Sequence, residues 1–194
     1  MQKFSLRSVV VATVVGLAGV AMVGCTTTQE SAQASPRSER ASLESQANAT
    51  LSRLYETAPG SREMIASAKG VLVFPAVIGG SFMIGVEHGE GVLRVANKAH
   101  SYYTTTGASI GWQAGGQSKA VIYVFSTQDA LDKFVNGNGW SGGVDATVAA
   151  GHVGANGSID TQTIKAPVTS FVITNTGLEA GVSLQGSKIT RVNR

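Results

Sequence analysis

The sequence predicts a mostly-β fold with peripheral helices (α+β), built on an antiparallel, glycine-rich sheet or on a barrel-like arrangement of strands. Glycine is abundant at 24 residues, whereas only 14% of the residues are charged. β-Branched and aromatic residues recur in short runs, as is typical of strands. These runs follow one another with few helical segments between them, which favours an antiparallel sheet. About 150 residues remain from Leu43 onward, enough for one domain of ordinary size.

The start of the chain has the pattern of a secretory leader. Lys3 and Arg7 precede an apolar run, residues 9–23, which is shorter than the ~20 residues that a membrane-spanning helix needs. The run ends in Gly24-Cys25, and Cys25 is the only cysteine in the chain. This ending resembles the bacterial lipoprotein box, which implies a signal peptide over residues 1–24, removed by cleavage, and lipid such as palmitate on Cys25. The alternative is an ordinary secretory leader with an incidental cysteine.

The residue after the cysteine bears on the destination of the protein. In Gram-negative lipoproteins an Asp at that position favours the inner membrane, whereas this chain has Thr26. The resemblance therefore implies an outer-membrane, lipid-anchored protein on the periplasmic face. Residues 25–42 contain no large apolar residue, so they are interpreted as the lipidated cysteine and a flexible tether. The folded domain is expected over residues 43–194.

The first helix of that domain is expected to be amphipathic. Ser42 is interpreted as its N-cap, and Pro59-Gly60 as its end. Its apolar side carries Leu43, Leu51 and Leu54 at helical spacing. Two interpretations remain open, because this side can cover a face of the sheet or lie among lipid headgroups.

Further elements follow from changes in periodicity and from turn residues. Short helices are expected over residues 61–68 and over residues 128–135, the latter capped by Thr127. Residues 71–74 should form a strand that Pro75 ends, and residues 81–87 and 91–96 should pair as a hairpin around His88-Gly89-Glu90. Other strands are expected over residues 100–106, 108–112, 120–125, 168–174, 178–184 and 188–192.

The charge of the chain excludes one class of partner. Removing residues 1–24 takes away two bases and no acid, which lowers the formal net charge from +3 to +1. A charge this small does not provide the basic field that nucleic acid requires. The local excess of bases at the C-terminus, Lys188, Arg191 and Arg194, is either a solvated tail or a contact for anionic headgroups, worth about 1 kcal/mol per charge.

Two short motifs permit an enzymatic interpretation. Residues 137–142 fit G-x-G-x-x-G, but a dinucleotide site needs a strand before this motif and a helix after it. Residues 107–111 fit G-x-S-x-G around Ser109, and Asp145 and His152 follow in the order found in hydrolases. A serine esterase is therefore a remote alternative.

No other cluster of residues predicts chemistry. The histidines lack ligand spacing and the acids are dispersed, so we expect no catalytic residues, no metal and no cofactor. The chain is accordingly interpreted as a protein that is not an enzyme.

Three segments resemble the SYLF domain family, a lipid-binding module. They are residues 66–75 (ASAKGVLVFP), 107–117 (GASIGWQAGGQ) and 178–187 (LEAGVSLQGS). They occur in the order found in that family, and the resemblance covers residues 43–192. Eukaryotic members bind phosphoinositide membranes partly through an N-terminal amphipathic helix, which corresponds to residues 43–58 here, and some fungal members bind actin.

The resemblance implies a membrane-anchored lipoprotein with a lipid-binding domain, in envelope organisation or lipid handling. Its partners would be membrane lipids: its own acyl anchor and, in addition, anionic headgroups. The alternative is a periplasmic structural or interaction protein that recruits an envelope protein through exposed aromatic loops around Trp112 or Trp140. Besides Cys25, the candidate lipid-binding residues are Leu43, Leu51, Arg53, Leu54, Lys188, Arg191 and Arg194.

Overall fold

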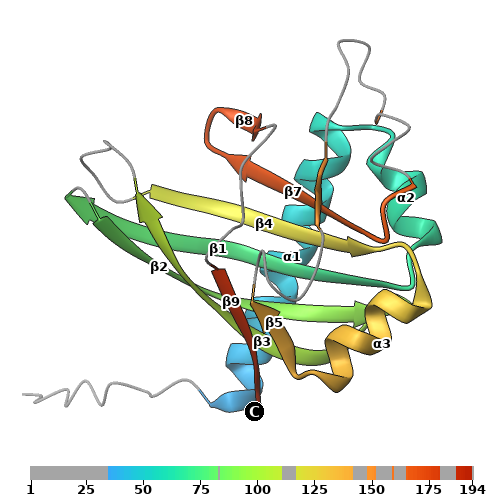
Figure 1. The fold of residues 1–194 in the computed structure, drawn as a ribbon, viewed down its shortest axis with the longest axis horizontal. Coiled ribbons are helices and arrows are strands. Elements are labelled where there is room, and N and C mark those ends of the chain that lie inside the picture. The colour runs from blue at the N-terminus through green and yellow to red at the C-terminus, as the bar shows by residue number, and fades with distance from the viewer. Residues whose placement is uncertain are drawn as a thin grey trace, which may run out of the picture. The chain divides into compact units, whose positions relative to one another are not determined.

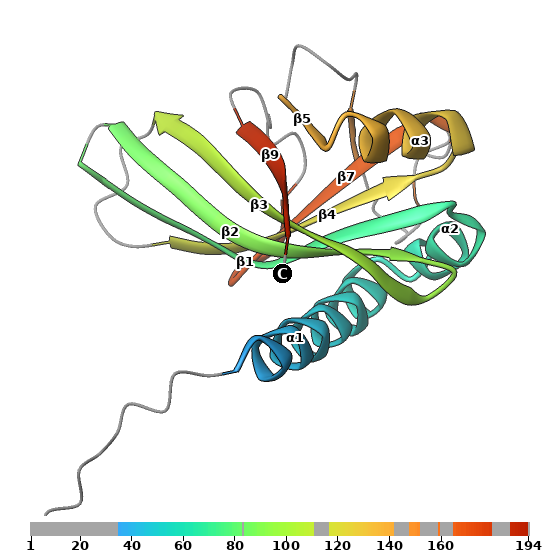
Figure 2. The same ribbon diagram turned by 90° about the horizontal axis from the view of Figure 1, so that it is seen from below.

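The computed structural model describes residues 35–82, 84–110, 117–141, 148–151, 159, 165–179 and 187–193. In these ranges the chain forms one curled sheet with helices on both of its faces (Figures 1 and 2). The predicted mostly-β, α+β fold class is thereby confirmed. The sheet is mixed rather than purely antiparallel, because one short strand, β6, pairs in parallel with β7.

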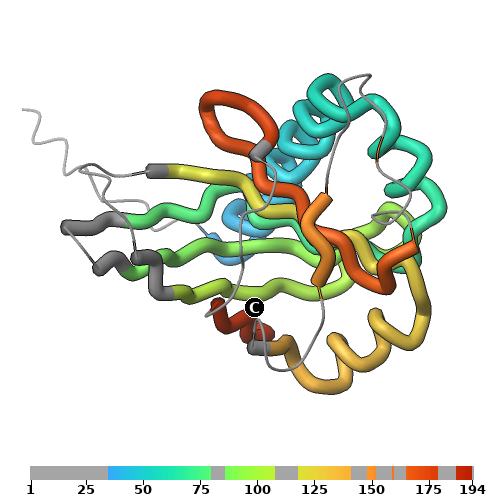
Figure 3. The backbone as a smooth tube through the Cα atoms, turned by 45° about the horizontal axis from the view of Figure 1, so that its top comes forward, coloured from blue at the N-terminus to red at the C-terminus, as the bar shows by residue number. Residues whose placement is uncertain are grey.

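The sheet has the strand order β5-β9-β3-β2-β1-β4-β7-β6, and β8 pairs with β7 outside this path. Strands β1 to β4 form a continuous antiparallel group, whereas β9 returns to pair with β3 (Figure 3). The strands are β1 (Gly70–Phe82), β2 (Ile84–Val95), β3 (Lys98–Ile110), β4 (Gln117–Phe125), β5 (Gly139–Ser141), β6 (Ala149–Ala150), β7 (Val168–Thr174), β8 (Gly177–Glu179) and β9 (Ser187–Val192).

Strand β1 does not end at Pro75, as the sequence predicted. It continues to Phe82, and its register with β2 shifts between Val73 and Ala76. A proline cannot donate to the ladder, and it is tolerated in a strand at such an irregularity. Pro75 therefore marks a bulge and not a terminus.

The hairpin predicted around His88-Gly89-Glu90 is wrong, because these residues lie in the middle of β2. A Cβ atom on Gly91 would lie 2.5 Å from Cδ1 of Phe74, and one on Gly89 would lie 2.9 Å from Cγ2 of Val77. The glycines thus allow side chains of β1 to lie over β2. The actual β2–β3 turn has Ala96 and Asn97 at positive φ, which is typical of tight hairpins.

Helix α1 (Pro36–Thr57) begins before the predicted cap at Ser42. Ser35 is its N-cap and accepts a hydrogen bond from the amide of Ser38 at 3.3 Å. Proline at the first helical position is favoured, because its missing N–H has no partner there. The part of the predicted tether from residue 36 to residue 42 is therefore helical.

The two short helices were predicted closely. Helix α2 (Ser61–Ser67) and helix α3 (Gln128–Asn136) lie where expected. Thr127 caps α3 by accepting a hydrogen bond from the amide of Ala130 at 3.3 Å. Within the described ranges, none of the helices combines the length and the apolar character needed to cross a bilayer.

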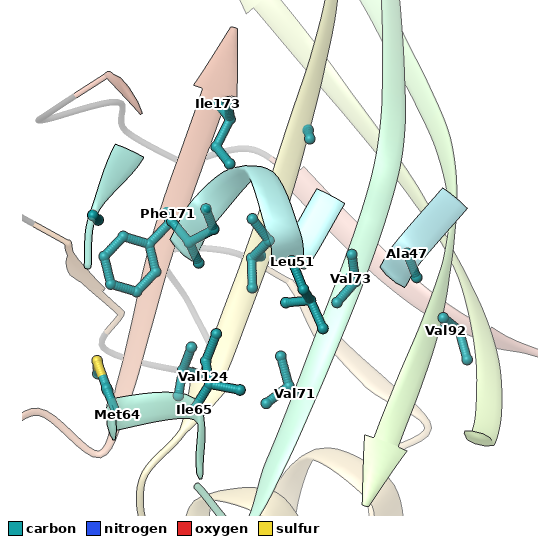
Figure 4. Close-up of a cluster of buried hydrophobic side chains, with 14 of the residues drawn as sticks. Ala47, Leu51, Met64, Ile65, Val71, Val73, Val92, Val124, Phe171 and Ile173 are labelled. Carbon is teal, nitrogen blue, oxygen red and sulfur yellow. The ribbon is translucent and has the colours of Figure 1, made fainter. Parts of the chain in front are cut away.

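The core has two parts, one on each face of the sheet. Helices α1 and α2 cover one face, where residues such as Leu51, Ile65 and Val73 pack together (Figure 4). Helix α3 and strand β5 cover the other face, where Phe134 and Trp140 pack among aromatic residues of the strands. We call these faces the α1 face and the α3 face.

Candidate functional site

The basic residues predicted to contact headgroups do not form one patch. Lys188 pairs with Thr106 and Arg191 pairs with Tyr103 in the β3–β9 register. Because side chains alternate along a strand, positions three apart point to opposite faces. Arg194 lies outside the described residues.

Arg53 is also separated from the C-terminal strand. It lies on α1, and its guanidinium donates a hydrogen bond to the carbonyl oxygen of Thr174 at the end of β7. Strand β7 is five positions from β9 in the order of the sheet. Arg53 therefore joins a helix to a strand, and contact with headgroups through it stays a prediction.

The leucines of α1 face the sheet. Leu43, Leu51 and Leu54 are buried, and they belong to the core of the α1 face. The sequence left open whether these leucines cover the sheet or lie among headgroups, and in the structure they cover the sheet. Contact between these leucines and lipid would require α1 to leave the sheet.

Polar contacts hold α1 on the sheet in addition to its leucines. The hydroxyl of Tyr102 donates to Glu44 at 2.7 Å, and Arg94 donates to Asn48 Oδ1 at 2.5 Å. The guanidinium of Arg40 lies over the Tyr102 ring, 5.9 Å from its centroid. Each of these contacts joins α1 to β2 or β3, so the helix is part of the folded domain.

The geometry around Ser109 is not that of a nucleophile elbow. Ser109 lies within β3 and pairs with Gly85 of β2, whereas an elbow requires a sharp turn from a strand into a helix. Asp145 and His152 lie outside the described residues. The esterase interpretation gains no support from the described backbone.

The described part of the G-x-G-x-x-G motif, residues 137–141, does not have the surroundings of a dinucleotide site. Gly137 follows the end of α3, and Gly139 begins β5. A dinucleotide site needs the opposite order, strand before helix. In the described part of the chain, no three His, Cys, Asp or Glu residues gather to hold a metal ion.

Trp140 was expected in an exposed loop, and that prediction is wrong. Its side chain is 8% exposed and packs edge-on against Phe134, with ring centroids 4.8 Å apart. The ring centroid of Tyr123 is 5.6 Å from that of Trp140. Burial raises the pKa of the Tyr123 phenol far above its usual value, although a hydrogen bond with Ser187 opposes the shift. Trp112 lies outside the described residues.

An ion pair lies across β1 on the α3 face. Lys119 Nζ is 2.8 Å from Glu87 Oε2, and both side chains are partly exposed. Gly79 lies between the two strands that carry them, and a Cβ on it would lie 3.0 Å from Cγ of Glu87. The pair neutralises the charges nearest to the end of the β1–β2 hairpin.

The surface that sequence reasoning missed is on the α1 face of β1 and β2. Ile78 and Val86 are exposed by 62% and 71%, and among the described residues no other large apolar side chain is exposed. Val86 shares its face with Val92, which packs against α1. The sequence carries only a partial signal of this surface, because residues 75–86 contain no ionisable side chain but nothing in them shows which apolar side chains are exposed.

A groove adjoins this surface. Its volume is about 580 Å³, and it lies between the first half of α1 and the middle of β1 and β2. Both apolar and polar residues line it: Ser38, Glu39, Ser42, Leu43, Gln46, Pro75, Ala76, Ile78, His88, Gly89 and Glu90.

Comparison with known families gives one match. Residues 106–194 match the family model Ysc84, which is described as "Las17-binding protein actin regulator". The matched part begins near the end of β3 and includes α3, β4 and all later strands. A comparison with curated proteins gave no match. The predicted recognition is confirmed over residues 106–194, which match the model of the SYLF (Ysc84) domain family.

Proposed function

We propose that this protein is a membrane-anchored lipoprotein whose SYLF-family domain contacts lipid beyond its own anchor, in envelope organisation or lipid handling. The observation that carries the lipid part of the proposal is the match of residues 106–194 to this family. The anchor rests on the leader pattern that ends at Cys25. Two or three acyl chains already hold a protein stably at a membrane. Lipid affinity of the domain would therefore serve capture, bridging or transfer rather than targeting.

Actin regulation, which the family description names, is not extended to this chain. The proposed leader directs the protein out of the cytoplasm, and the domain then has no access to cytoplasmic filaments. The proposed destination is the periplasmic face of the outer membrane, as Thr26 implies.

The anchor is tested by expressing the full chain with labelled palmitate. We expect label on the mature protein and a mass increase that corresponds to acyl chains on Cys25. Cys25→Ser should abolish the label and release the protein from the membrane fraction. Unlabelled wild-type protein would refute lipidation and leave an ordinary secretory leader.

Lipid contact by the domain is tested without the anchor. Residues 26–194 are mixed with neutral and with anionic vesicles at several salt concentrations, and flotation is measured. Binding to either vesicle supports the proposal. If the chain floats with neither, the acyl anchor is the only membrane contact, and recruitment of an envelope protein partner becomes the better explanation.

The remote esterase alternative is tested on the same material. Any ester hydrolysis is measured with wild type and with Ser109→Ala. Equal rates would remove Ser109 from consideration as a nucleophile.

A further inference from the structure

We infer that the free end of the β1–β2 hairpin enters the lipid bilayer and is the lipid-contacting surface of this domain. This inference rests on the proposed function, which it deepens by naming the surface. Ile78 and Val86 are its described anchors, at 62% and 71% exposure. Exposed apolar residues are unremarkable when scattered singly, but these two lie on neighbouring strands and on one face.

The register places the two side chains together. Ile78 pairs with His88, and Gly80 pairs with Val86, so Ile78 and Val86 are diagonal neighbours, which lie about 7–8 Å apart in an antiparallel pair. Gly80 carries no side chain that could shield Val86. Figure 2 shows this end of the hairpin extending beyond α1, which covers the strands nearer to their middle.

The distribution of charge limits how deep the hairpin can enter. Residues 75–86 have no ionisable side chain, and the next residues along β2 are Glu87 and His88. Burying an unpaired charge in hydrocarbon is costly, but Glu87 is paired with Lys119. Three residues of each strand lie beyond Gly79 and Glu87, residues 80–82 and 84–86, and they span about 10 Å, roughly a third of the ~30 Å hydrocarbon core. Ile78 pairs with His88, one position before this level, so Ile78 would contact the membrane interface while Val86 enters the leaflet. The hairpin therefore reaches into one leaflet.

The backbone of the hairpin is suited to an apolar environment. Strand β2 is paired on both sides, with β1 from position 84 to 90 and with β3 along the same residues. Backbone groups in lipid must be satisfied internally. The central position of β2 in the sheet meets this requirement at Val86.

The position of α1 favours a bilayer over other partners for the surface around Ile78 and Val86. Leu43 and Ile78 line the same groove, so the first half of α1 lies beside the hairpin. Nine residues separate Cys25 from Ser35, and a chain of that length spans at most about 35 Å. An anchor on Cys25 would thus keep this end of the domain close to the membrane surface.

The chemistry of the surface predicts which lipids matter. Glu39 lies beside the hairpin in the same groove and does not favour anionic headgroups. Binding through Ile78 and Val86 should be apolar, so it should occur on neutral vesicles. Salt screens charges but does not weaken apolar burial, so this binding should persist at high salt.

The test uses residues 26–194 with single cysteines. Both core clusters lie within residues 43–189, so this chain retains the complete folded unit and has no cysteine of its own. Val86→Cys is labelled with an environment-sensitive dye, and phosphatidylcholine vesicles are added. We expect blue-shifted emission at Val86→Cys. The matched control is Lys133→Cys, an exposed site on α3 at the opposite end of the domain (Figure 1), where emission should not change.

Variants without the dye test how much Ile78 and Val86 contribute to vesicle affinity. Ile78→Thr combined with Val86→Thr keeps β-branched side chains in both strands and should lower vesicle affinity ~10-fold or more. Lys133→Thr should leave affinity unchanged. Raising the salt from about 0.1 M to about 1 M, which shortens the Debye length from ~10 Å to ~3 Å, should leave wild-type binding intact.

Three results would overturn the inference. If the chain floats while the dye at Val86 stays in water, another surface binds lipid, and the proposed function stands without this inference. If nothing floats, both fail. If the chain instead forms dimers that the Ile78→Thr/Val86→Thr variant abolishes, and no vesicle binding occurs, the surface is an interface between copies of this chain.

Discussion

Replacing Leu54 with alanine tests whether α1 packs in the core of the domain or belongs to the membrane. Leu54 is fully buried between α1 and the sheet. If α1 packs as the structure has it, Leu54→Ala removes a side chain that no neighbour can replace. If α1 instead belonged to the membrane, the same change would hardly alter the stability of the domain in water.

The expected loss follows from the buried carbon atoms. Three carbons at about 0.8 kcal/mol each give about 2.4 kcal/mol for lost transfer from water. The cavity that remains because the surroundings collapse only partly adds to this, and buried Leu→Ala changes cost about 3–5 kcal/mol in well-packed proteins. We therefore expect the free energy of unfolding to fall by about 3 kcal/mol and Tm to fall by about 6–12 °C.

The assay is urea unfolding of residues 26–194, followed by circular dichroism. Ser52→Ala is the matched control, because Ser52 is exposed on the same helix and alanine there should change stability by no more than about 0.5 kcal/mol. A loss below about 1 kcal/mol for Leu54→Ala, equal to the control, would refute the packing of α1 on the sheet.

Three other changes test features of the fold. Gly91→Ala should destabilise the domain by about 1–3 kcal/mol in urea unfolding, because its Cβ would lie 2.5 Å from Cδ1 of Phe74; wild-type stability would mean that β1 does not lie over this glycine. Thr127→Ala should cost about 1 kcal/mol in the same assay through loss of the cap on α3, and no loss would contradict that cap. The buried phenol of Tyr123 has a raised pKa, so the folded protein keeps a proton that the unfolded chain loses above about pH 10. Stability should therefore fall as the pH rises beyond about 10, and Tyr123→Phe should flatten this decline in unfolding measured against pH; an equally steep decline would contradict it.

Local sequence signals predicted the helices better than the hairpins. Thr127 identified the start of α3, and the spacing of the leucines identified the buried side of α1. Glycine misled the prediction at His88-Gly89-Glu90, because the same residue serves tight turns and close approach between side chains and backbone. Only the position of Phe74 and Val77 over β2 distinguishes the two uses, and that position is a tertiary property.

Some features of the candidate site could likewise be predicted from the sequence, and others could not. Once residues 188–192 are predicted as a strand, the period of two already places Lys188 and Arg191 on opposite faces, so their separation could have been predicted. The exposure of Ile78 and Val86 could not, because it depends on where α1 stops covering the sheet. Trp140 resembles a loop residue in its glycine-rich surroundings, yet tertiary packing buries it between α3 and the strands.

Strand β9 has a consequence for how the protein is made. It is the last of the described strands, yet it lies between β5 and β3, and its pairing with β3 joins residues 80 to 90 positions apart, such as Thr106 and Lys188. Closing so long a loop is slow compared with local hairpins. Until β9 has been synthesised, β3 presents an open edge that can pair with another chain. A chain truncated before β9 would therefore aggregate rather than fold to a slightly weaker domain.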